Sequence, residues 1–372
     1  MNRMAPLPPV VWSDDVLRHE PKGEVWVGVM TPGTEVPGRA TVLRDACVAG
    51  GATVVPATAH DDSMLHAVHD PGLLAHLETV ADEWARGDYE RRVGQDRVVP
   101  YVFPTEGMLD GLPAMAPTAT HARAGVWCYD TMTLVGPGTW PAARAAVDVA
   151  QTAVDLVLGG APAAYALTRP PGHHATRRAF GGSCYLNNAA VAAEALLAGG
   201  VATVAVVDVD AHHGNGTQAV FWERPDVLYA SLHVDPAAGW FPHVVGSADE
   251  CGAGAGAGTT VNAPLEPGTG DPGWLAALDG LLVSLTAYRP EAVVVSLGVD
   301  AAGADPESPL DVTTDGFVGA GSRLAALGLP TVLVHEGGYA LDRLGIDTVA
   351  VLRAFGSDAA NDSAARPVRR SS

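Results

Sequence analysis

Ionisable side chains crowd one short stretch of the sequence, Thr203 to Gly216 (TVAVVDVDAHHGNG). Its first part, residues 203–207, is an apolar run rich in β-branched residues, which predicts a strand buried on both faces. Because side chains alternate along an extended chain, Asp208, Asp210 and His212 then point the same way. Such groups are costly to bury unless they are paired or bind a metal. The pattern therefore indicates metal ligands at the carboxyl end of a strand.

Three other predicted strands also run into polar residues that could do chemistry. They are followed by the pair His173 and His174, by Asp300 and by Tyr339. Open α/β sheets bind their ligands at the carboxyl ends of the strands, which lie along one edge of the sheet. We therefore expect these side chains to converge with those after residue 207.

The converging residue types predict a catalytic metal. A metal held by Asp210, His212 and Asp300 would keep open coordination positions, as catalytic zinc sites do. Two carboxylates leave the metal less Lewis-acidic than three imidazoles would. A nearby base is therefore useful, and His173 and His174 supply tandem imidazoles.

The elements that must position these residues alternate along the chain. Apolar runs predict strands at 24–29, 53–56, 165–167, 203–207, 226–232, 291–297 and 331–335. Periodic or alanine-rich segments predict helices at 39–50, within 61–84, and at 141–159, 186–197, 272–288 and 317–327. Strands alternating with helices over the whole length predict a single α/β domain, with a parallel sheet and helices on both faces.

The ends of the chain and one internal stretch lack such patterns. The proline-rich residues 1–22 are expected to wrap the surface, and residues 23–355 to form the catalytic domain. Residues 356–372 are small and polar, which predicts a disordered tail. Residues 88–123 show no clear periodicity, and a loop of that length is usually functional.

Composition narrows the partners. The net charge of −20 argues against binding nucleic acid or anionic lipid, and suits cationic or neutral small substrates. No apolar run is long enough to span a membrane, and the N-terminus lacks the shape of a signal peptide, so we expect a cytoplasmic protein. The four cysteines form no CxxC motif, and we interpret them as reduced thiols.

The sequence resembles the histone deacetylase superfamily in five motifs that occur in the family's order and spacing. They are RPPGHHA (169–175), GGSCYLNNAAVAA (181–193), VVDVDAHHGNGTQ (206–218), SLGVDAAGADP (296–306) and EGGY (336–339). The resemblance runs from about Val25 to Phe355. It implies the single-domain, three-layer arginase/deacetylase-like fold, with a mostly parallel sheet of about eight strands. HVDPAAGWFP and the Asn at 215 favour the branch of bacterial acetylpolyamine amidohydrolases and class II deacetylases over class I.

The resemblance also implies roles for individual residues. These are zinc ligation by Asp210, His212 and Asp300, acid–base catalysis by His174, electrostatic tuning by His173, orientation of the imidazoles by Asp208 and Asn215, and polarisation of the scissile carbonyl by Tyr339. A potassium ion is implied near Asp208, Asp210, His212, Ser231 and Leu232. The implied channel residues are Gly182, Ser183, Trp240, Phe241, His243 and, from the 88–123 loop, Glu106.

Ser183 departs from the family pattern, which usually has Phe or Tyr at the matching position. That ring forms one wall of a narrow channel, opposite a wall from the loop matching residues 240–243. Two interpretations remain open. Another ring, such as Phe180 or Trp240, fills the space, or the channel is wider and more polar than in relatives.

The related arginases use the same fold with two manganese ions, and two glycines argue against that arrangement here. Gly214 stands where the arginase Asp-x-His-x-Asp motif needs its last Asp, and Gly298 where the Asp-x-Asp pair needs its first. Both carboxylates for a second metal are missing, so we expect one metal per chain.

The function predicted from these residues is a zinc-dependent amidohydrolase that deacetylates N-acetylated amines such as acetylpolyamines. The alternatives are an acetyl-lysine protein deacetylase, a deacylase for a special N-acyl metabolite, and an inactive binding module, which the intact set of ligands disfavours. We expect one Zn²⁺ per chain, with Fe²⁺ as an alternative in the cell, and a structural K⁺. A homodimer or higher homo-oligomer is expected.

Overall fold

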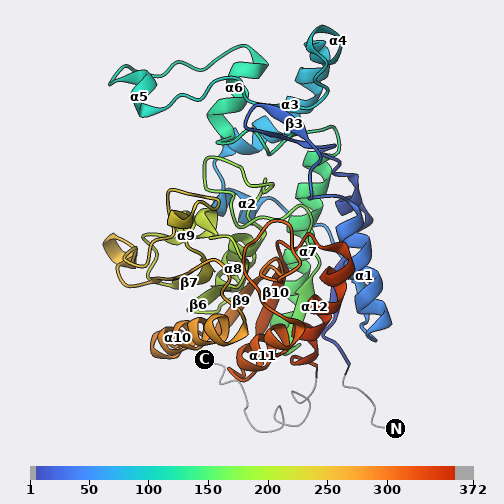
Figure 1. The fold of residues 1–372 in the computed structure, drawn as a ribbon, viewed down its shortest axis with the longest axis vertical. Helices are drawn as coiled ribbons and strands as arrows, with labels where there is room; N and C mark the ends of the chain where they lie inside the picture. The colour runs from blue at the N-terminus through green and yellow to red at the C-terminus, as the bar shows by residue number, and fades with distance from the viewer. Residues whose placement is uncertain (1–5, 357–372) are drawn as a thin grey trace.

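An eight-stranded parallel sheet forms the centre of the structure, a computed structural model that describes residues 6–356 (Figure 1). Its strands are β1 (Val10–Trp12), β4 (Val54–Pro56), β5 (Ala163–Ala166), β6 (Val204–Asp208), β7 (Val227–Val234), β8 (Thr260–Leu265), β9 (Ala292–Leu297) and β10 (Thr331–His335). They lie in the order β4-β1-β5-β10-β9-β6-β7-β8. The strands β2 (Glu24–Trp26) and β3 (Val29–Thr31) form a separate antiparallel hairpin.

Helices cover both faces of this sheet, and further helices lie away from it at one end of the molecule (Figure 1). They are α1 (Gly38–Ala49), α2 (Ser63–Val68), α3 (Pro71–Arg86), α4 (Tyr89–Val93), α5 (Glu106–Leu109), α6 (Thr120–Trp127), α7 (Thr139–Leu158), α8 (Asn188–Ala198), α9 (Asn215–Phe221), α10 (Asp271–Tyr288), α11 (Thr314–Ala325) and α12 (Leu341–Arg353). No helix in residues 6–356 combines the length and apolar character needed to cross a membrane.

The strand order explains which helices share a face. Crossover connections between parallel strands are right-handed, so the direction of each step along the sheet decides the face on which its helix lies. Steps in one direction place α7 and α8 together, and steps in the other direction place α1, α10 and α11 together. The helix α12 follows the last strand and packs against α1 and α11. The three-layer α/β fold expected from the sequence is confirmed.

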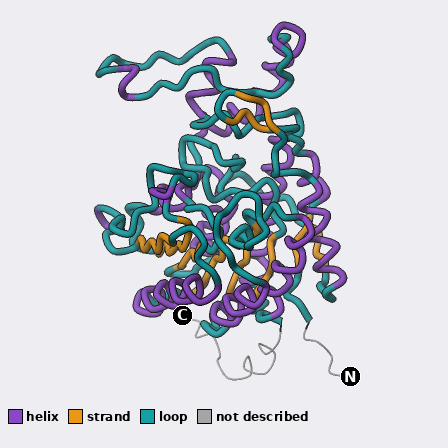
Figure 2. The backbone as a smooth tube through the Cα atoms, in the orientation of Figure 1, coloured by secondary structure: helices purple, strands orange, loops and turns teal. Residues whose placement is uncertain are grey.

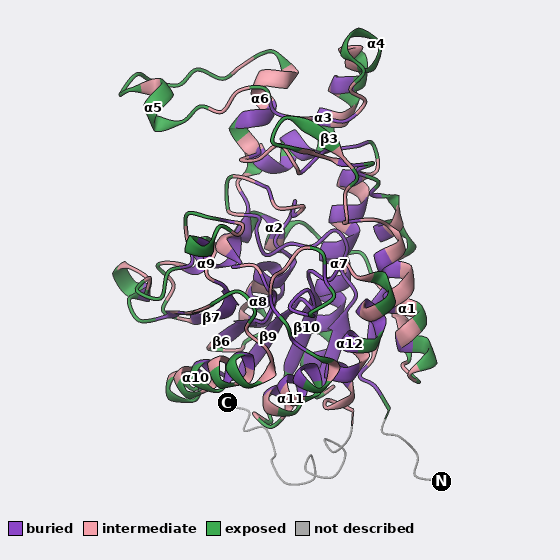
Figure 3. Ribbon diagram, in the orientation of Figure 1, coloured by how far each residue is buried: buried purple, intermediate pink, exposed green. Residues whose placement is uncertain are grey.

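The central strands are apolar on both faces because both faces are covered. Every residue of β5, β6, β7, β9 and β10 is buried, and these strands form the purple centre of Figure 3. Such a buried sheet holds its strand ends rigidly, and those ends carry the site described below.

The amino-terminal part of the chain differs from the prediction. Val10–Trp12 is the buried strand β1 between β4 and β5, so the expectation that residues 1–22 only wrap the surface is wrong for this stretch. A three-residue strand is too short to show a period. The strand predicted at 24–29 is not part of the main sheet. Its first three residues form β2 of the separate hairpin.

The structure also contains elements that the sequence analysis did not predict or divided differently. The sequence did not predict β8, α9 or α12. The helix predicted within 61–84 is two helices, with Pro71 in the first turn of α3. Most of the disordered tail predicted at 356–372 lies outside the described residues.

The long stretch 88–123 carries only α4, α5 and the first turn of α6. In Figure 2 its teal loops project from the body of the molecule, with α5 at the far end of an arm. We call residues 100–119 the arm.

Candidate active site

The predicted metal ligands converge at the carboxyl ends of two adjacent strands. Asp210 and His212 follow β6, Asp300 follows β9, and these strands pair in parallel register. Ligand atoms of the three side chains lie within 4.8 Å of one another. The Nδ1 atom of His212 is 3.2 Å from Asp210 Oδ1 and 3.0 Å from Asp300 Oδ2.

Backbone amides hold the two carboxylates in place. The amide of Ala211 donates to Asp300 Oδ1 at 2.8 Å, and the amide of Gly337 donates to Asp210 Oδ2 at 2.8 Å. Burial, together with the charge of Asp210, raises the pKa of Asp300 to about 7. Two fully buried carboxylates beside an imidazole therefore suit a divalent cation, and the O,O,N donor set is one that zinc and iron accept.

The two glycines leave no room for the second-metal ligands of arginases. A Cβ atom on Gly298 would lie 2.0 Å from Asp210 Oδ2, and one on Gly214 would lie 2.2 Å from Asp208 Oδ2. Any side chain at either position would require the site to rearrange. The geometry therefore suits a single metal.

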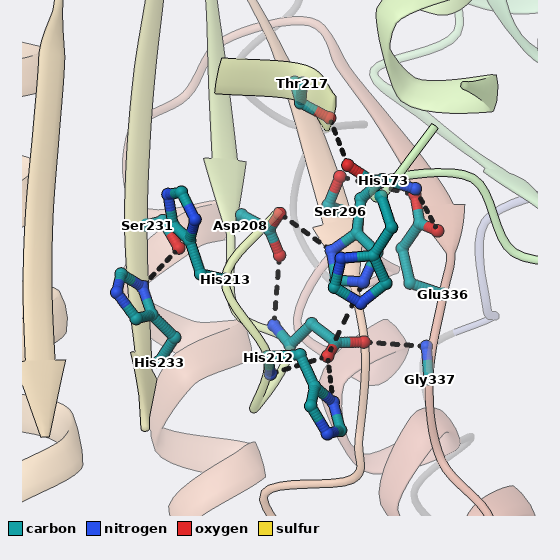
Figure 4. A network of polar contacts seen from close by, with 12 residues as sticks. His173, Asp208, His212, His213, Thr217, Ser231, His233, Ser296, Glu336 and Gly337 are labelled. Atoms are coloured by element: carbon teal, nitrogen blue, oxygen red, sulfur yellow. Dashed lines mark hydrogen bonds and ion pairs between the residues drawn. The ribbon is translucent and has the colours of Figure 1, made fainter. Parts of the chain in front are cut away.

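The tandem imidazoles lie side by side but have different partners. Their ring centroids are 4.0 Å apart. The Nδ1 atom of His173 lies 3.1 Å from Asp208 Oδ2, as Figure 4 shows, whereas His174 Nδ1 lies 2.7 Å from Asn215 Oδ1. The Glu336 carboxylate accepts from the amide of His173 at 3.1 Å and so fixes the backbone of this pair.

The partners give the two imidazoles opposite pKa shifts. Burial lowers the pKa of His173, but the carboxylates of Asp210 and Asp208 outweigh it and raise that pKa to about 10. Burial and the charges of His173 and His212 hold the pKa of His174 well below its usual value. His174 is therefore the imidazole free to accept a proton near neutral pH.

Tyr339 completes the set, and its ring is held under a guanidinium group. The Arg39 Cζ atom lies 4.6 Å from the ring centroid. Burial raises the pKa of the Tyr339 phenol well above its usual value, despite the opposing charge of Arg39. The phenol therefore keeps its proton and can donate a hydrogen bond.

These groups open into a small cavity of about 80 Å³. It is lined by Glu24, Thr34, Met132, His174, Gly182, Ser183, His212, Phe241, Glu307 and Tyr339. A wide depression of about 1110 Å³ adjoins it and shares Met132 and Phe241.

The predicted channel residues are divided between these spaces. Gly182, Ser183 and Phe241 line the small cavity, and Phe241 packs edge-on against His174 at 4.7 Å between ring centroids. His243 lines only the wide depression. Trp240 and Glu106 line neither space, and Glu106 lies in α5 on the arm (Figure 1).

Sequence reasoning missed two carboxylates in the small cavity. Glu24 reaches it from the hairpin, and Glu307 from the loop after β9. Glu307 accepts a hydrogen bond from the Thr34 hydroxyl at 2.8 Å. Its place just after the SLGVDAAGADP motif was a signal for Glu307, whereas Glu24 was hidden in a predicted strand.

The residues expected around potassium lie at the ends of β6 and β7. Asp208 and Ser231 are direct neighbours in the register of these strands. Ser231 and Leu232 are both buried, and the Ser231 hydroxyl lies 2.8 Å from His233 Nδ1.

Comparisons with known proteins found a matching family model and similar relatives. A family model described as histone deacetylase domain matches residues 34–355. The chain is 41% identical over 345 residues to an acetylpolyamine amidohydrolase of Mycoplana ramosa, covering 92% of this chain and 98% of the relative. It is 42% identical over 340 residues to an acetylpolyamine amidohydrolase of Burkholderia pseudomallei, covering 91% and 96%. A crystal structure of acetylpolyamine aminohydrolase from Burkholderia pseudomallei superimposes with a TM-score of 0.86 at 40% identity, covering 94% of this chain and 99% of that one.

Proposed function

Since this chain belongs to the histone deacetylase family and is a hydrolase of amide bonds, we propose that it deacetylates N-acetylated polyamines with one zinc ion. One observation carries the choice of substrate: the carboxylates of Glu24 and Glu307 line the same small cavity as His174 and Tyr339. An acetyl group next to the catalytic residues would leave the rest of the amine beside these acids. A cationic amine is the chemistry that they recognise.

The mechanism follows from the charge states of the site. When bound by Asp210, His212 and Asp300, zinc supplies a Lewis acid that activates water and the acyl carbonyl. His174 accepts the proton of the attacking water, because its depressed pKa leaves it neutral. Once protonated, it returns this proton to the nitrogen of the leaving amine as the amide C–N bond breaks.

The other two groups stabilise charge without taking part in the proton transfer. The Tyr339 phenol donates a hydrogen bond to the carbonyl oxygen as negative charge develops there. His173, which its neighbouring carboxylates keep protonated, holds a positive charge beside His174. Burial lowers the pKa of His174, and the charge of His173 lowers it further.

A substrate comparison tests this function. The kcat/KM for an acetylated polyamine should exceed that for a neutral N-acetylalkylamine of equal length by about 10-fold or more. Glu307→Gln and Glu24→Gln should each reduce this preference, whereas Glu266→Gln, an exposed carboxylate outside the cavity, should leave it unchanged. Equal rates for both substrates would contradict the proposal.

The metal is tested separately. Purified protein should carry about one zinc or iron ion per chain, and a chelator should abolish turnover, which returns on adding zinc. Asp210→Ala or Asp300→Ala should lose the ion, and two ions per chain would contradict the single-metal site.

We expect K⁺ at Asp208, Ser231 and Leu232 to act structurally.

A deacylase for a special N-acyl metabolite is the second candidate, and Ser183 favours it. Phe180 is buried in the core against Tyr185, and Trp240 does not line the cavity. Neither ring therefore replaces the missing wall, and Met132 is the flexible apolar side chain left beside the gap. A bulkier amine or a longer acyl group would use this space.

We also propose that the chain forms a homodimer through the arm. The apolar side chains Tyr101, Met108, Leu112 and Met115 are exposed there. Large exposed apolar surfaces of this kind usually mark interaction sites. Met115→Glu should reduce the mass measured by light scattering towards that of one chain, whereas Val283→Glu, at an exposed apolar residue of α10, should not. A monomeric wild type would contradict this.

A further inference from the structure

A buried carboxylate outside the metal site accepts hydrogen bonds from three backbone amides near the small cavity. Asp305, in the loop between β9 and α11, is only 7% exposed. Its Oδ2 atom accepts from the amides of Tyr339 at 2.6 Å and of Ala340 at 3.0 Å. Its Oδ1 atom accepts from the amide of Glu307 at 3.0 Å. One side chain thus contacts the backbone of both Tyr339 and Glu307.

The segment that carries Tyr339 is held on its carbonyl side by Arg39. The Arg39 guanidinium donates to the carbonyl oxygens of Glu336 and Gly338, both at 2.6 Å, and lies over the Tyr339 ring. None of these contacts involves the amides of Tyr339 and Ala340. Asp305 therefore supplies the other half of the support for this segment.

The helix after Tyr339 has no capping side chain of its own. Ala340 is the N-cap of α12 and offers no side-chain acceptor. A carboxylate near the start of a helix is stabilised by the helix dipole. Among residues 6–356, Asp305 is the hydrogen-bond acceptor found for the amides of Tyr339 and Ala340, and a buried amide without a partner is costly.

We propose that Asp305 is a positioning residue that sets the place of the Tyr339 phenol and couples it to Glu307. This role rests on the proposed function, in which Tyr339 polarises the acyl carbonyl. The hydrogen bonds of Asp305 go to backbone amides, and Asp305 does not line the small cavity, so it holds Tyr339 without touching the substrate. Small misplacements of a catalytic group lower turnover strongly.

A double-mutant cycle tests the coupling to Tyr339. With the acetylated amine that wild type hydrolyses best, Asp305→Asn should lower kcat by roughly 10-fold or more, with metal content unchanged. In a Tyr339→Phe background the same change should cost less than about 3-fold, because the phenol is already gone. The matched control is Asp342→Asn, an exposed carboxylate in the first turn of α12, which should leave kcat unchanged.

Amide hydrogen exchange provides a readout that does not depend on catalysis. Exchange in the peptide 336–344 should speed up in Asp305→Asn and Asp305→Ala relative to wild type and to Asp342→Asn. If Asp305→Ala does not fold, Asp305→Asn retains one oxygen acceptor and still tests the idea. Full additivity of the two kcat losses, or unchanged exchange, would overturn the proposal. A wild type inactive on acetylated amines would instead contradict the proposed function, and the exchange experiment would still decide the role of Asp305.

Discussion

At the scale of single residues, the two adjacent imidazoles differ in their hydrogen-bond partners, one of which is a carboxylate and the other an amide. Asp208 faces His173 and Asn215 faces His174, at similar hydrogen-bond distances. Burial lowers the pKa of both imidazoles, but the carboxylates of Asp210 and Asp208 stabilise the imidazolium ion of His173 by charge, so the two pKa values move apart. The difference assigns the acid–base role to His174.

Removing this imidazole should therefore affect turnover and leave the metal bound. His174→Ala is expected to lower kcat by roughly 100-fold or more, in line with the usual contribution of a general base. Steady-state kinetics together with metal analysis measure both effects. His66→Ala, at an exposed position on α2, is the control. Full activity in the His174 variant would contradict the assignment of the general base to His174.

Glu24 leads to a prediction about pH. Burial, together with the carboxylate of Glu307, raises the pKa of Glu24 to about 7, and Asp130 and Glu35 add to the negative surroundings. Below that pH the side chain is protonated and neutral, and above it the side chain is an anion that attracts a cation. The KM for an acetylated polyamine should therefore fall as the pH rises through about 7.

The comparison that isolates Glu24 uses a second substrate and a variant. The KM for a neutral N-acetylalkylamine should show no such step, and Glu24→Gln should remove the step for the polyamine. A step that persists in Glu24→Gln would assign the titration to another group.

At the scale of elements, a short turn places Ser183 on the cavity wall. Gly181 and Cys184 pair with each other across the turn, and Ser183 has a φ of 60° between them. The Ser183 amide donates to the Thr133 hydroxyl at 2.9 Å, which fixes the direction of its side chain. Asp130 holds the neighbouring Gly182 amide at 2.6 Å. The turn thus places Ser183 on the wall of the small cavity.

Restoring a ring at this position should narrow the cavity. Ser183→Tyr is expected to lower KM for a linear acetylated amine and to impair bulky or long-acyl substrates, because a second ring would grip the methylene chain opposite Phe241. Ser183→Ala, which adds no ring, is the control. If wild type already deacetylates acetylated polyamines efficiently and Ser183→Tyr changes nothing, Met132 has rebuilt the wall.

At the scale of the whole molecule, the net charge of −20 acts on any charged substrate. An anionic protein attracts cations over a distance that salt shortens to about 8 Å at physiological ionic strength. We predict that kcat/KM for an acetylated polyamine falls as sodium chloride rises, while that for a neutral amide stays constant. Rates measured in parallel at several salt concentrations decide this. A salt-independent rate for the polyamine would favour the metabolite deacylase.

The sequence by itself determined the chemistry of the site. The stretch 203–216 predicted both a buried strand and the residues that follow it, because alternation along an extended chain is a local property. Asp300 and Tyr339 follow other predicted strands. They were expected to lie beside the residues after 207, because the carboxyl ends of parallel strands share one edge of the sheet. The structure brings these residues together as that reasoning expected.

Only the tertiary structure decided which distant segments meet at the cavity. Glu24 and Glu307 come from opposite ends of the chain, Asp305 reaches Tyr339 from another loop, and Trp240 lies away from the cavity that its neighbour Phe241 lines. The tertiary structure also decided that residues 10–12 form the strand β1, because they are a strand only through their pairing with β4 and β5. Contacts of this kind depend on which distant segments pack against one another, and the local hydrophobic period does not specify those partners.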